Sequence, residues 1–234
     1  MILEQIKIFY DGVNIEKYGS LSYVKGFTTN PTLIKNANMK YNNYKDFALN
    51  FLKQTRNMPV SFEVFADDLD GMIKQAKVIS AWGDNIYVKI PIINTKGVST
   101  QTVIEELNKL NIKVNITAVF TKKQIDIAVK AIQNISCSNI LSIFCGRIAD
   151  TGVDPIDICE YAIGCCKNKN IEILWASSRE ILNIFQAAKC GCDIITLNDS
   201  IIKKIPNIGK KLETFSLETV KMFVNDAVKS GISF

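Results

Sequence analysis

The chain has 234 residues, of which 47% are hydrophobic and 22% charged, with a formal net charge of +5 and no histidine. It is short for two ordinary domains, so we expect one soluble globular domain over residues 1–234. The absence of histidine excludes every mechanism that depends on that side chain. The mild, evenly spread charge argues against a nucleic-acid partner and is compatible with small anionic substrates.

Short apolar runs rich in Ile, Val, Phe or Thr recur along the chain and predict β-strands. The eight runs are residues 6–11, 24–29, 59–64, 86–92, 113–120, 140–146, 171–177 and 193–198. Apolar residues at helical spacing predict helices over Tyr41–Arg56, Leu69–Trp82, Thr100–Leu110, Gln124–Ile132 and, at the end of the chain, Ser216–Gly231. Thr121 and Gln124 form a capping-box pattern. We expect no helix before the first strand.

Strand–helix alternation repeated eight times predicts a closed (β/α)8 barrel, or TIM barrel, with an additional C-terminal helix. The alternative is an open doubly wound sheet, which usually has fewer strands and a glycine-rich first turn. The segment Asp11-Gly12-Val13-Asn14 is not such a turn. No linker of Pro, Gly or Ser and no charge block interrupts the chain, so we find no domain boundary.

Several polar residues stand at or near the ends of the predicted strands, where a barrel places its active site. They are Asp11, Asn30, Glu63, Lys89, Asn115, Thr117 and Ser177. A single buried Asn or Thr is more often a hydrogen-bonded core group than a functional one. A lysine with two carboxylates is different, because buried ion pairs add little stability and such a cluster is more often functional.

Lys89 lies in the run IYVKIPII, which otherwise has the sequence of a fully buried strand. Burial disfavours the ammonium form, so the neutral amine becomes available as a nucleophile toward a carbonyl, as in Schiff-base catalysis. The iminium that forms is an electron sink for cleavage of a carbon–carbon bond. Asp11 and Glu63 supply the proton carriers that this reaction needs.

Five segments resemble signature segments of the transaldolase family, in this order: GFTTNPTLIKNA, IYVKIP, NITAVFT, SIFCGRIADTG and ILWASSRE. The resemblance extends from Tyr10 to Thr196 and implies a (β/α)8 fold without a metal or an organic cofactor. It implies that Lys89 is the Schiff-base lysine and that Asp11 is the acid–base aspartate. Glu63 with Thr117 is similar to the family's pair that positions a water.

The resemblance also implies how a substrate is held. Asn30 and Asn115 are similar to the asparagines that bind the dihydroxyacetone hydroxyls, and Arg147, Ser177 and Arg179 fall where the family binds the sugar phosphate. Arginine offers a fork of donors, and we expect Ser177-Ser178-Arg179 to open a helix after the seventh strand, where free N–H groups favour an anion. The alternative is that both arginines are ordinary surface charges.

Two residues bear on the choice between transfer and cleavage. A branch of the family, the fructose-6-phosphate aldolases, tends to carry Gln at the position of Glu63 and Tyr at the position of Phe144. A tyrosine hydroxyl could protonate the enamine and release dihydroxyacetone, which Phe144 cannot do. The expected reaction is therefore transfer of a dihydroxyacetone unit from sedoheptulose 7-phosphate to glyceraldehyde 3-phosphate, which gives erythrose 4-phosphate and fructose 6-phosphate.

Three positions depart from the family pattern. Trp175 stands where a small residue is more common, Asp199 stands where a proline-containing segment is common, and Gly26-Phe27 precedes TTNP. An inward Trp175 would narrow the cavity.

The seven cysteines lie mostly within apolar segments and are expected to be reduced core thiols. Cys165-Cys166 with Cys190-x-Cys192 could suggest zinc, but the spacing fits no C-x2-C pattern and histidine is absent, so we expect no metal site. The start of the chain lacks a signal-peptide pattern, and no segment reaches the ~18 apolar residues of a membrane span. We expect a cytoplasmic protein without a membrane partner.

Two other function classes stay open. One is a non-catalytic sugar-phosphate-binding barrel, which would have no use for Lys89. The other is a structural oligomer whose main feature is the last helix. Family members use such a helix in ring-like homo-oligomers, and the apolar residues Phe215, Leu217, Phe223 and Val224 lead us to expect a homo-oligomer here as well.

Overall fold

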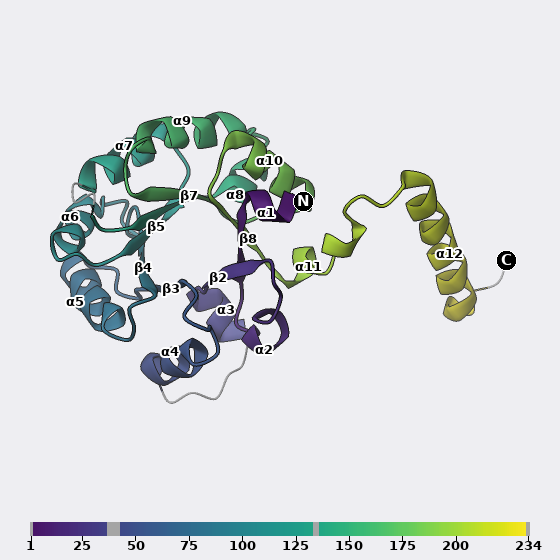
Figure 1. The fold of residues 1–234 in the computed structure, drawn as a ribbon, viewed down its shortest axis with the longest axis horizontal. Helices are drawn as coiled ribbons and strands as arrows, with labels where there is room; N and C mark the ends of the chain where they lie inside the picture. The colour runs from purple at the N-terminus through teal and green to yellow at the C-terminus, as the bar shows by residue number, and fades with distance from the viewer. Residues whose placement is uncertain (1, 37–42, 133–135, 233–234) are drawn as a thin grey trace.

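The computed structural model describes residues 2–36, 43–132 and 136–232. Figure 1 shows a ring of strands with helices around its outside, and one long helix that stands apart from the ring. All strand pairs are parallel, each strand pairs with its neighbours in sequence, and β1 pairs with β8 to close the barrel. The closed barrel confirms the predicted (β/α)8 fold and decides against the open doubly wound sheet.

Each of the eight predicted strands is present. The strands are β1 (Lys7–Asp11), β2 (Val24–Thr28), β3 (Val60–Glu63), β4 (Ile86–Pro91), β5 (Val114–Val119), β6 (Asn139–Ile143), β7 (Ile171–Trp175) and β8 (Ile194–Leu197).

Helices connect the strands on the outside of the barrel. They are α2 (Ile15–Tyr18), α3 (Pro31–Asn36), α4 (Tyr44–Leu52), α5 (Leu69–Ser80), α6 (Gln101–Lys109), α7 (Lys122–Ala131), α8 (Cys145–Ala149), α9 (Ile156–Cys166), α10 (Leu182–Cys190) and α11 (Asp199–Ile202), and a 3-10 turn η1 (Ile205–Asn207) follows. The capping box predicted at Thr121 and Gln124 is present at the start of α7, where each side chain accepts a backbone N–H.

Three predictions about helices were wrong, and one of them is the start of the last helix, which begins at Leu212 rather than at Ser216. A short helix, α1 (Ile2–Gln5), precedes β1, and its four residues are too few to show helical periodicity in a sequence. The helix expected from Tyr41 to Arg56 begins at Tyr44, with Asn43 as its N-cap, and ends at Leu52. Turns follow it because Arg56 and Asn57 have positive φ angles, and residues 41 and 42 lie outside the described part of the chain.

The barrel has apolar layers on both sides of its strands. The larger layer lies between strands and helices, and a smaller cluster inside the barrel consists of Phe9, Tyr87, Ile140, Leu174, Ala176 and Ile194. Phe9 and Tyr87 stand two residues before Asp11 and Lys89, and side chains two apart in a strand share a face. An apolar floor therefore lies directly beneath the polar residues at the barrel mouth.

Trp175 belongs to the outer layer, so the concern that its indole narrows the cavity was wrong. Leu174 is the residue of β7 that points inward, in the inner cluster. Counting back in twos from Ser177 would turn Trp175 inward, but Ser177 has φ +64 and the alternation of the strand breaks there.

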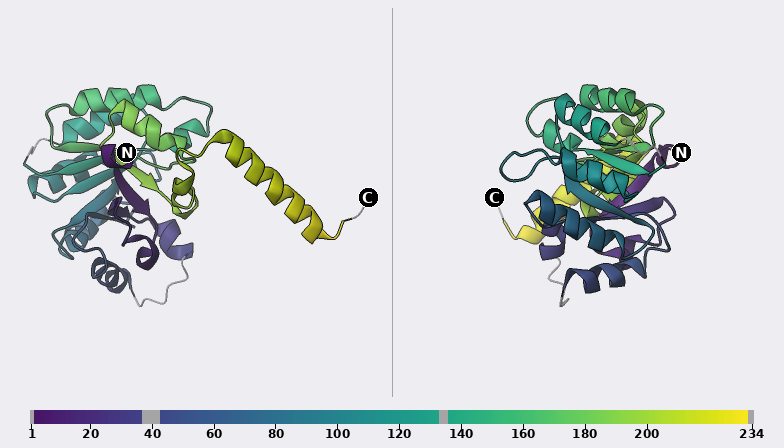
Figure 2. Two further views of the ribbon diagram at one scale, coloured as in Figure 1. Left: turned by 45° about the vertical axis from the view of Figure 1, so that its right-hand side comes forward. Right: turned by 90° about the vertical axis from the view of Figure 1, so that its left-hand side faces the viewer.

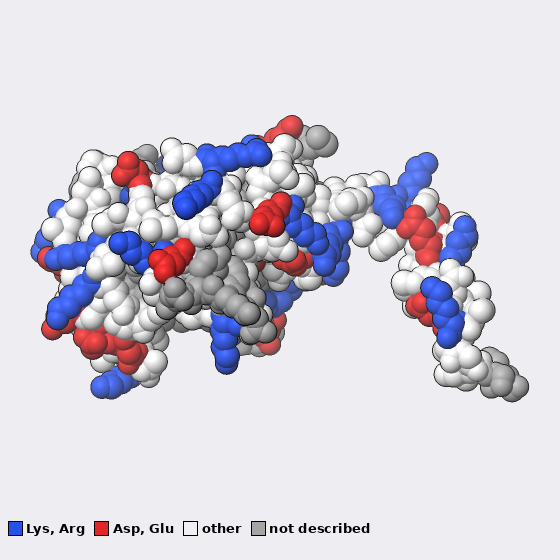
Figure 3. All heavy atoms as spheres, turned by 90° about the horizontal axis from the view of Figure 1, so that it is seen from below, with Lys and Arg blue, Asp and Glu red and all other residues white. Residues whose placement is uncertain are grey.

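The last helix, α12 (Leu212–Ser230), has no buried residue. In the left view of Figure 2 it extends away from the barrel on a short connection. Its exposed apolar side chains include Phe215, Leu217, Val220, Phe223, Val224 and Val228. In Figure 3, charges of both signs are interspersed over the face shown, and uncharged side chains separate the charges of α12. Within the described residues, no helix combines the length and apolar character that a bilayer crossing needs.

Candidate active site

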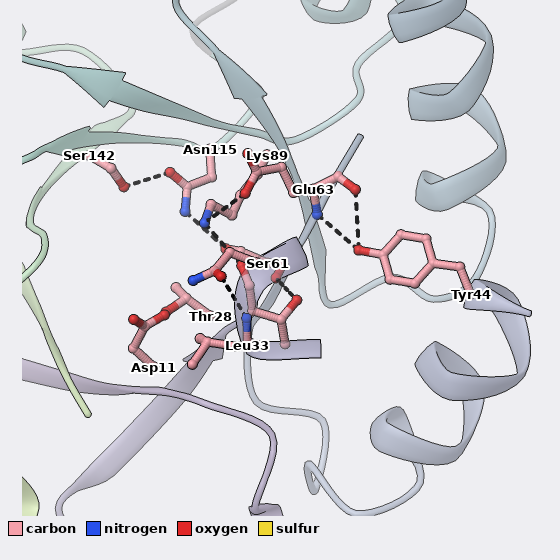
Figure 4. Close-up of polar contacts among 11 residues, drawn as sticks. Asp11, Thr28, Leu33, Tyr44, Ser61, Glu63, Lys89, Asn115 and Ser142 are labelled. Carbon is pink, nitrogen blue, oxygen red and sulfur yellow. Dashed lines mark hydrogen bonds and ion pairs between the residues drawn. The ribbon is translucent and has the colours of Figure 1, made fainter. Parts of the chain in front are cut away.

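The centre of the site is Lys89, which lies inside the barrel and is only 7% exposed. Its ammonium is 3.3 Å from the Glu63 carboxylate and donates to the backbone carbonyl of Thr29 at 3.0 Å (Figure 4). The parallel register places Glu63, Lys89 and Asn115 side by side on three adjacent strands. The buried lysine inferred from the sequence therefore has an acidic partner at the same height of the barrel.

Asp11 ends β1 on the other side of the cavity. The Thr28 hydroxyl donates to Asp11 Oδ1 at 2.7 Å. Removal from water inside the barrel mouth raises the pKa of the Asp11 carboxyl, while the charge of Lys89 and the Thr28 hydrogen bond oppose the rise. A carboxyl that has a raised pKa and interacts electrostatically with the Lys89 amine is suited to exchange protons with a substrate.

Asn115 is held by two serines inside the barrel. The Ser142 hydroxyl donates to Asn115 Oδ1 at 2.7 Å, and Asn115 Nδ2 donates to Ser61 Oγ at 3.0 Å (Figure 4). These bonds fix the orientation of the Asn115 amide, so that its Nδ2 is the atom that can donate a further hydrogen bond into the cavity. On the same strand, the buried Thr117 hydroxyl has no hydrogen-bond partner among the described residues, so it is available to a water or a substrate.

The side chains enclose a cavity of about 150 Å³ at the carboxyl ends of the strands. Eight of the ten predicted site residues line it: Asp11, Asn30, Lys89, Asn115, Thr117, Phe144, Arg147 and Ser177. Glu63 lies behind Lys89 rather than on the cavity wall. The structure thus brings together most of the residues that were chosen from separate strands.

A larger hollow of about 740 Å³ lies at the opposite end of the barrel, between α1 and the starts of β2 and β8. It is lined by residues such as Leu3, Tyr23 and Gly191 and does not contain the polar cluster. In this fold the amino-terminal ends of the strands serve stability rather than catalysis, so we place the site in the smaller cavity.

Asn30 has a structural role in addition to its place in the cavity. Its side-chain oxygen accepts the backbone N–H of Leu33 at 2.9 Å and thereby caps α3, which begins at Pro31. The side-chain nitrogen is therefore the part of Asn30 that can serve a ligand.

Arg147 and Ser177 both line the cavity. Arg147 is carried by α8, and a Cβ atom added at the preceding Gly146 would lie 1.6 Å from the Ser177 carbonyl oxygen. Only glycine permits this approach of α8 to the loop after β7. Ser177 does not open a helix, contrary to the sequence-based expectation, because α10 begins only at Leu182. An anion here would meet side chains and loop amides rather than a helix terminus.

Arg179 is not among the residues that line the cavity. Its Nε donates to Asp150 Oδ1 at 3.0 Å, and its guanidinium forms an ion pair with that carboxylate outside the cavity. The hydrogen bond from Arg179 lowers the pKa of Asp150. Of the two arginines that the sequence had grouped, only Arg147 lines the cavity.

Four polar residues of the site were not singled out from the sequence: Thr28, Ser142 and Thr196, which line the cavity, and Ser61, which binds Asn115. Each lies in one of the predicted strands, at the observed end of that strand or one to two residues before it. A search for polar residues near the end of every predicted strand would have found them. Asp199, another departure from the family pattern, lies outside the cavity and accepts hydrogen bonds from the hydroxyls of Tyr10 and Tyr18.

Comparisons with known proteins show which family the chain belongs to. The chain matches the family described as Transaldolase/Fructose-6-phosphate aldolase over residues 8–233. A probable transaldolase of Thermoplasma volcanium is 36% identical over 218 residues, which cover 90% of this chain and 93% of that protein. A probable transaldolase of Nitrosopumilus maritimus is 32% identical over 206 residues, which cover 86% and 87%.

Solved structures share the architecture at much lower identity. The deoxyribose phosphate aldolase of Aeropyrum pernix has a TM-score of 0.59 and 12% identity over 90% of this chain and 93% of that one. At this identity the likeness concerns the fold alone. The match over residues 8–233 and the relatives above 30% identity show that the chain belongs to the transaldolase/fructose-6-phosphate aldolase family.

Proposed function

We propose that the protein is a transaldolase that carries a dihydroxyacetone unit between sugar phosphates as a Schiff base on Lys89. The observation that supports this most is the buried Lys89 beside Glu63, in one cavity with Asp11. A buried ion pair seldom stabilises a fold. A non-catalytic binding barrel would therefore gain neither stability nor activity from this desolvated charge.

The first half of the reaction forms a carbon–nitrogen bond to Lys89 and breaks a carbon–carbon bond of the ketose. The Lys89 ammonium first passes a proton to the Glu63 carboxylate 3.3 Å away. The neutral amine then attacks the ketone carbon of a ketose phosphate, and loss of water gives the iminium. Asp11 then takes the proton of the hydroxyl on the carbon beyond the scissile bond. The bond electrons move to the iminium, an aldose phosphate leaves, and an enamine of dihydroxyacetone remains on Lys89.

The second half reverses these steps with an aldehyde acceptor. The enamine carbon attacks the acceptor carbonyl, Asp11 returns its proton to the new hydroxyl, and water hydrolyses the iminium. Glu63, which is 3.3 Å from Lys89, and the unpartnered Thr117 hydroxyl would hold that water and move its protons. Asn30 and Asn115 would hold the hydroxyls of the three-carbon unit.

The size and lining of the cavity fit this division. About 150 Å³ is small beside the ~300–1,000 Å³ of pockets for drug-sized ligands, so the enclosed part suits a three-carbon unit. The phosphate would then lie beside Arg147 and Ser177. Arg179 could reach the phosphate only by releasing Asp150.

A second candidate, a fructose-6-phosphate aldolase, shares all steps up to the enamine. It differs in releasing free dihydroxyacetone, which requires fast protonation of the enamine. Phe144 lines the cavity and has no hydroxyl, with its ring centroid 5.6 Å from that of Phe120. This apolar pair favours transfer over release.

The test of the function is to trap the intermediate. The protein is incubated with fructose 6-phosphate and reduced with borohydride, and the modified residue is found by mass spectrometry of peptides. We expect a dihydroxyacetone-derived addition on Lys89 after release of glyceraldehyde 3-phosphate. An addition on a different lysine, or no addition, would contradict the proposal.

A further inference from the structure

The hydrogen-bond ladder between β2 and β3 stops at the level of Lys89. Phe27 N–H donates to the Pro59 carbonyl at 2.9 Å, and Thr29 N–H donates to the Ser61 carbonyl at 3.1 Å. In a regular parallel ladder the next bond would run from Glu63 N–H to the Thr29 carbonyl. That bond is replaced, because β2 ends at Thr28 and the chain turns into α3 at Pro31.

Each of the two groups that would form this bond has a different partner. The Thr29 carbonyl accepts the Lys89 ammonium at 3.0 Å, and Glu63 N–H donates to the Tyr44 hydroxyl oxygen at 3.1 Å. The same Tyr44 hydroxyl donates to the Glu63 carbonyl at 3.2 Å (Figure 4). A single side chain from α4 thus takes the place of the missing neighbour strand and satisfies both backbone groups of Glu63 on that side.

Tyr44 is held firmly enough to fix Glu63. Asn43 caps α4 by accepting Asp46 N–H at 2.9 Å, so the first turn that carries Tyr44 is anchored. The Tyr44 ring stacks on Phe65 with centroids 4.3 Å apart and meets the edge of Trp82 at 5.3 Å. Burial raises the pKa of the Tyr44 hydroxyl, so it keeps its proton and can both donate and accept.

We propose that Tyr44 is a positioning residue of the active site, which sets Glu63 at the height of Lys89 and leaves the Thr29 carbonyl to the lysine. This inference rests on the proposed function, because it assigns Tyr44 a part in forming the imine. Tyr44 is not among the residues that line the cavity, so it acts through the groups it contacts, chiefly the backbone of Glu63. Removing its hydroxyl would release the backbone that carries the Glu63 carboxylate.

The test compares two variants that each lose one buried hydroxyl. Tyr44→Phe keeps the ring and its stacking, and Tyr18→Phe removes a hydroxyl that binds Asp199 away from the site. With dihydroxyacetone as carbonyl probe, we expect the rate of borohydride-trapped imine formation to fall on the order of tenfold in Tyr44→Phe and to stay unchanged in Tyr18→Phe. With fructose 6-phosphate, kcat should fall by a similar factor while KM changes less than about twofold.

A double-mutant cycle separates positioning from a general loss of structure. If Tyr44 acts through Glu63, Tyr44→Phe should slow trapping in the wild-type background but have no further effect in Glu63→Gln. An equal loss in both backgrounds, or no loss in the wild type, overturns the proposal. Failure of the wild-type protein to form any adduct would count against the proposed function instead.

A second variant covers the case in which Tyr44→Phe is unstable at the assay temperature. Tyr44→Ala opens space beside the surface groove that Tyr44 lines with Phe65 and Trp82, and p-cresol or toluene can be added to refill it. We expect p-cresol, which carries a hydroxyl, to restore the trapping rate and toluene to restore only the melting temperature. Equal rescue of the rate by both compounds contradicts a role for the hydroxyl.

Discussion

The barrel interior and the terminal helix depart from the usual distribution of residues in opposite directions. Inside the barrel, Lys89 keeps a charged side chain at 7% exposure, whereas on α12 Phe223 and Val228 are 62% and 77% exposed. Charged side chains are rarely buried unless paired, and contiguous apolar surface is rarely left open on a chain that works alone. Neither feature helps the single chain to fold.

This difference indicates that the barrel interior and α12 are suited to different kinds of binding partner. The buried charges enclose a small cavity, which suits the small molecule with a carbonyl and an anionic group that we propose as substrate. The apolar residues of α12 are spread along a helix that has no buried residue, and such residues are suited to pack against another protein surface. We propose that this surface belongs to a second copy of the chain, in a homo-oligomer.

The largest expected effect comes from Lys89. Lys89→Ala should remove the trapped adduct and essentially all activity while the protein stays folded, because no other lysine is among the described residues that line the cavity. Lys89→Arg should fail equally, since a guanidinium does not deprotonate in proteins. The measurement is peptide mass spectrometry after borohydride reduction, with circular dichroism as the folding control. Retained activity in either variant would remove the lysine from the mechanism.

The next largest effect concerns α12. We expect light scattering at micromolar concentration to give a mass several times that of one chain. Phe223→Lys combined with Val224→Lys should reduce this mass toward one chain, because a charge in an apolar interface is left without water or partner. Asn225→Lys adds a charge at a polar position of the same helix and should leave assembly intact. A wild-type monomer would end the proposed role of α12.

Arg147 should affect binding of the phosphate and little else. Arg147→Ala should raise KM for phosphorylated sugars, because it removes charge-assisted hydrogen bonds that contribute about 1.5–3 kcal/mol to binding of the phosphate. The reaction with dihydroxyacetone should stay nearly unchanged. Arg179→Ala is the matched control, and its effect should be smaller because Arg179 binds Asp150 outside the cavity. Equal damage to both substrates in Arg147→Ala would indicate a structural arginine.

Phe144 should shift the balance between products. Phe144→Tyr adds a hydroxyl at the cavity with little change in volume, and we expect more free dihydroxyacetone from fructose 6-phosphate relative to sedoheptulose 7-phosphate formed with erythrose 4-phosphate. The two products are measured with and without the acceptor. Rapid release of dihydroxyacetone by the unchanged protein, whatever the acceptor concentration, would assign it to the aldolase side of the family.

The smallest effect is a gain in stability. Burial raises the pKa of Asp11 above its ordinary value of 3.8, so the folded protein holds this proton more tightly than the unfolded chain. Stability from this group is therefore present at low pH and is lost as the pH rises through the folded pKa. The Asp11→Asn variant has no carboxyl to ionise at this position, so it does not lose this stability at high pH. Its melting temperature should be about 2–4 °C higher than that of the wild type at pH 8, and the difference should shrink toward pH 4. A lower melting temperature at pH 8 would contradict the direction of the shift.

The sequence by itself determined the barrel and most of its polar centre. Eight apolar runs, the capping box at Thr121 and the place of Lys89 in an otherwise buried strand are local patterns, and alternation along each strand follows from backbone geometry. This is why Asp11, Lys89, Asn115 and Thr117 could be assigned to one cavity before any coordinates were known.

Tertiary structure decided the rest, because it depends on contacts between distant segments. The ion pair of Arg179 with Asp150 spans 29 positions, and the positive φ of Ser177 reverses the alternation that would have turned Trp175 inward. The bond from Tyr44 to Glu63 exists only because β2 ends one residue too early to complete the ladder with β3. These contacts depend on which polar groups lack a hydrogen-bond partner in the folded chain. The periodicity of the sequence therefore does not predict them.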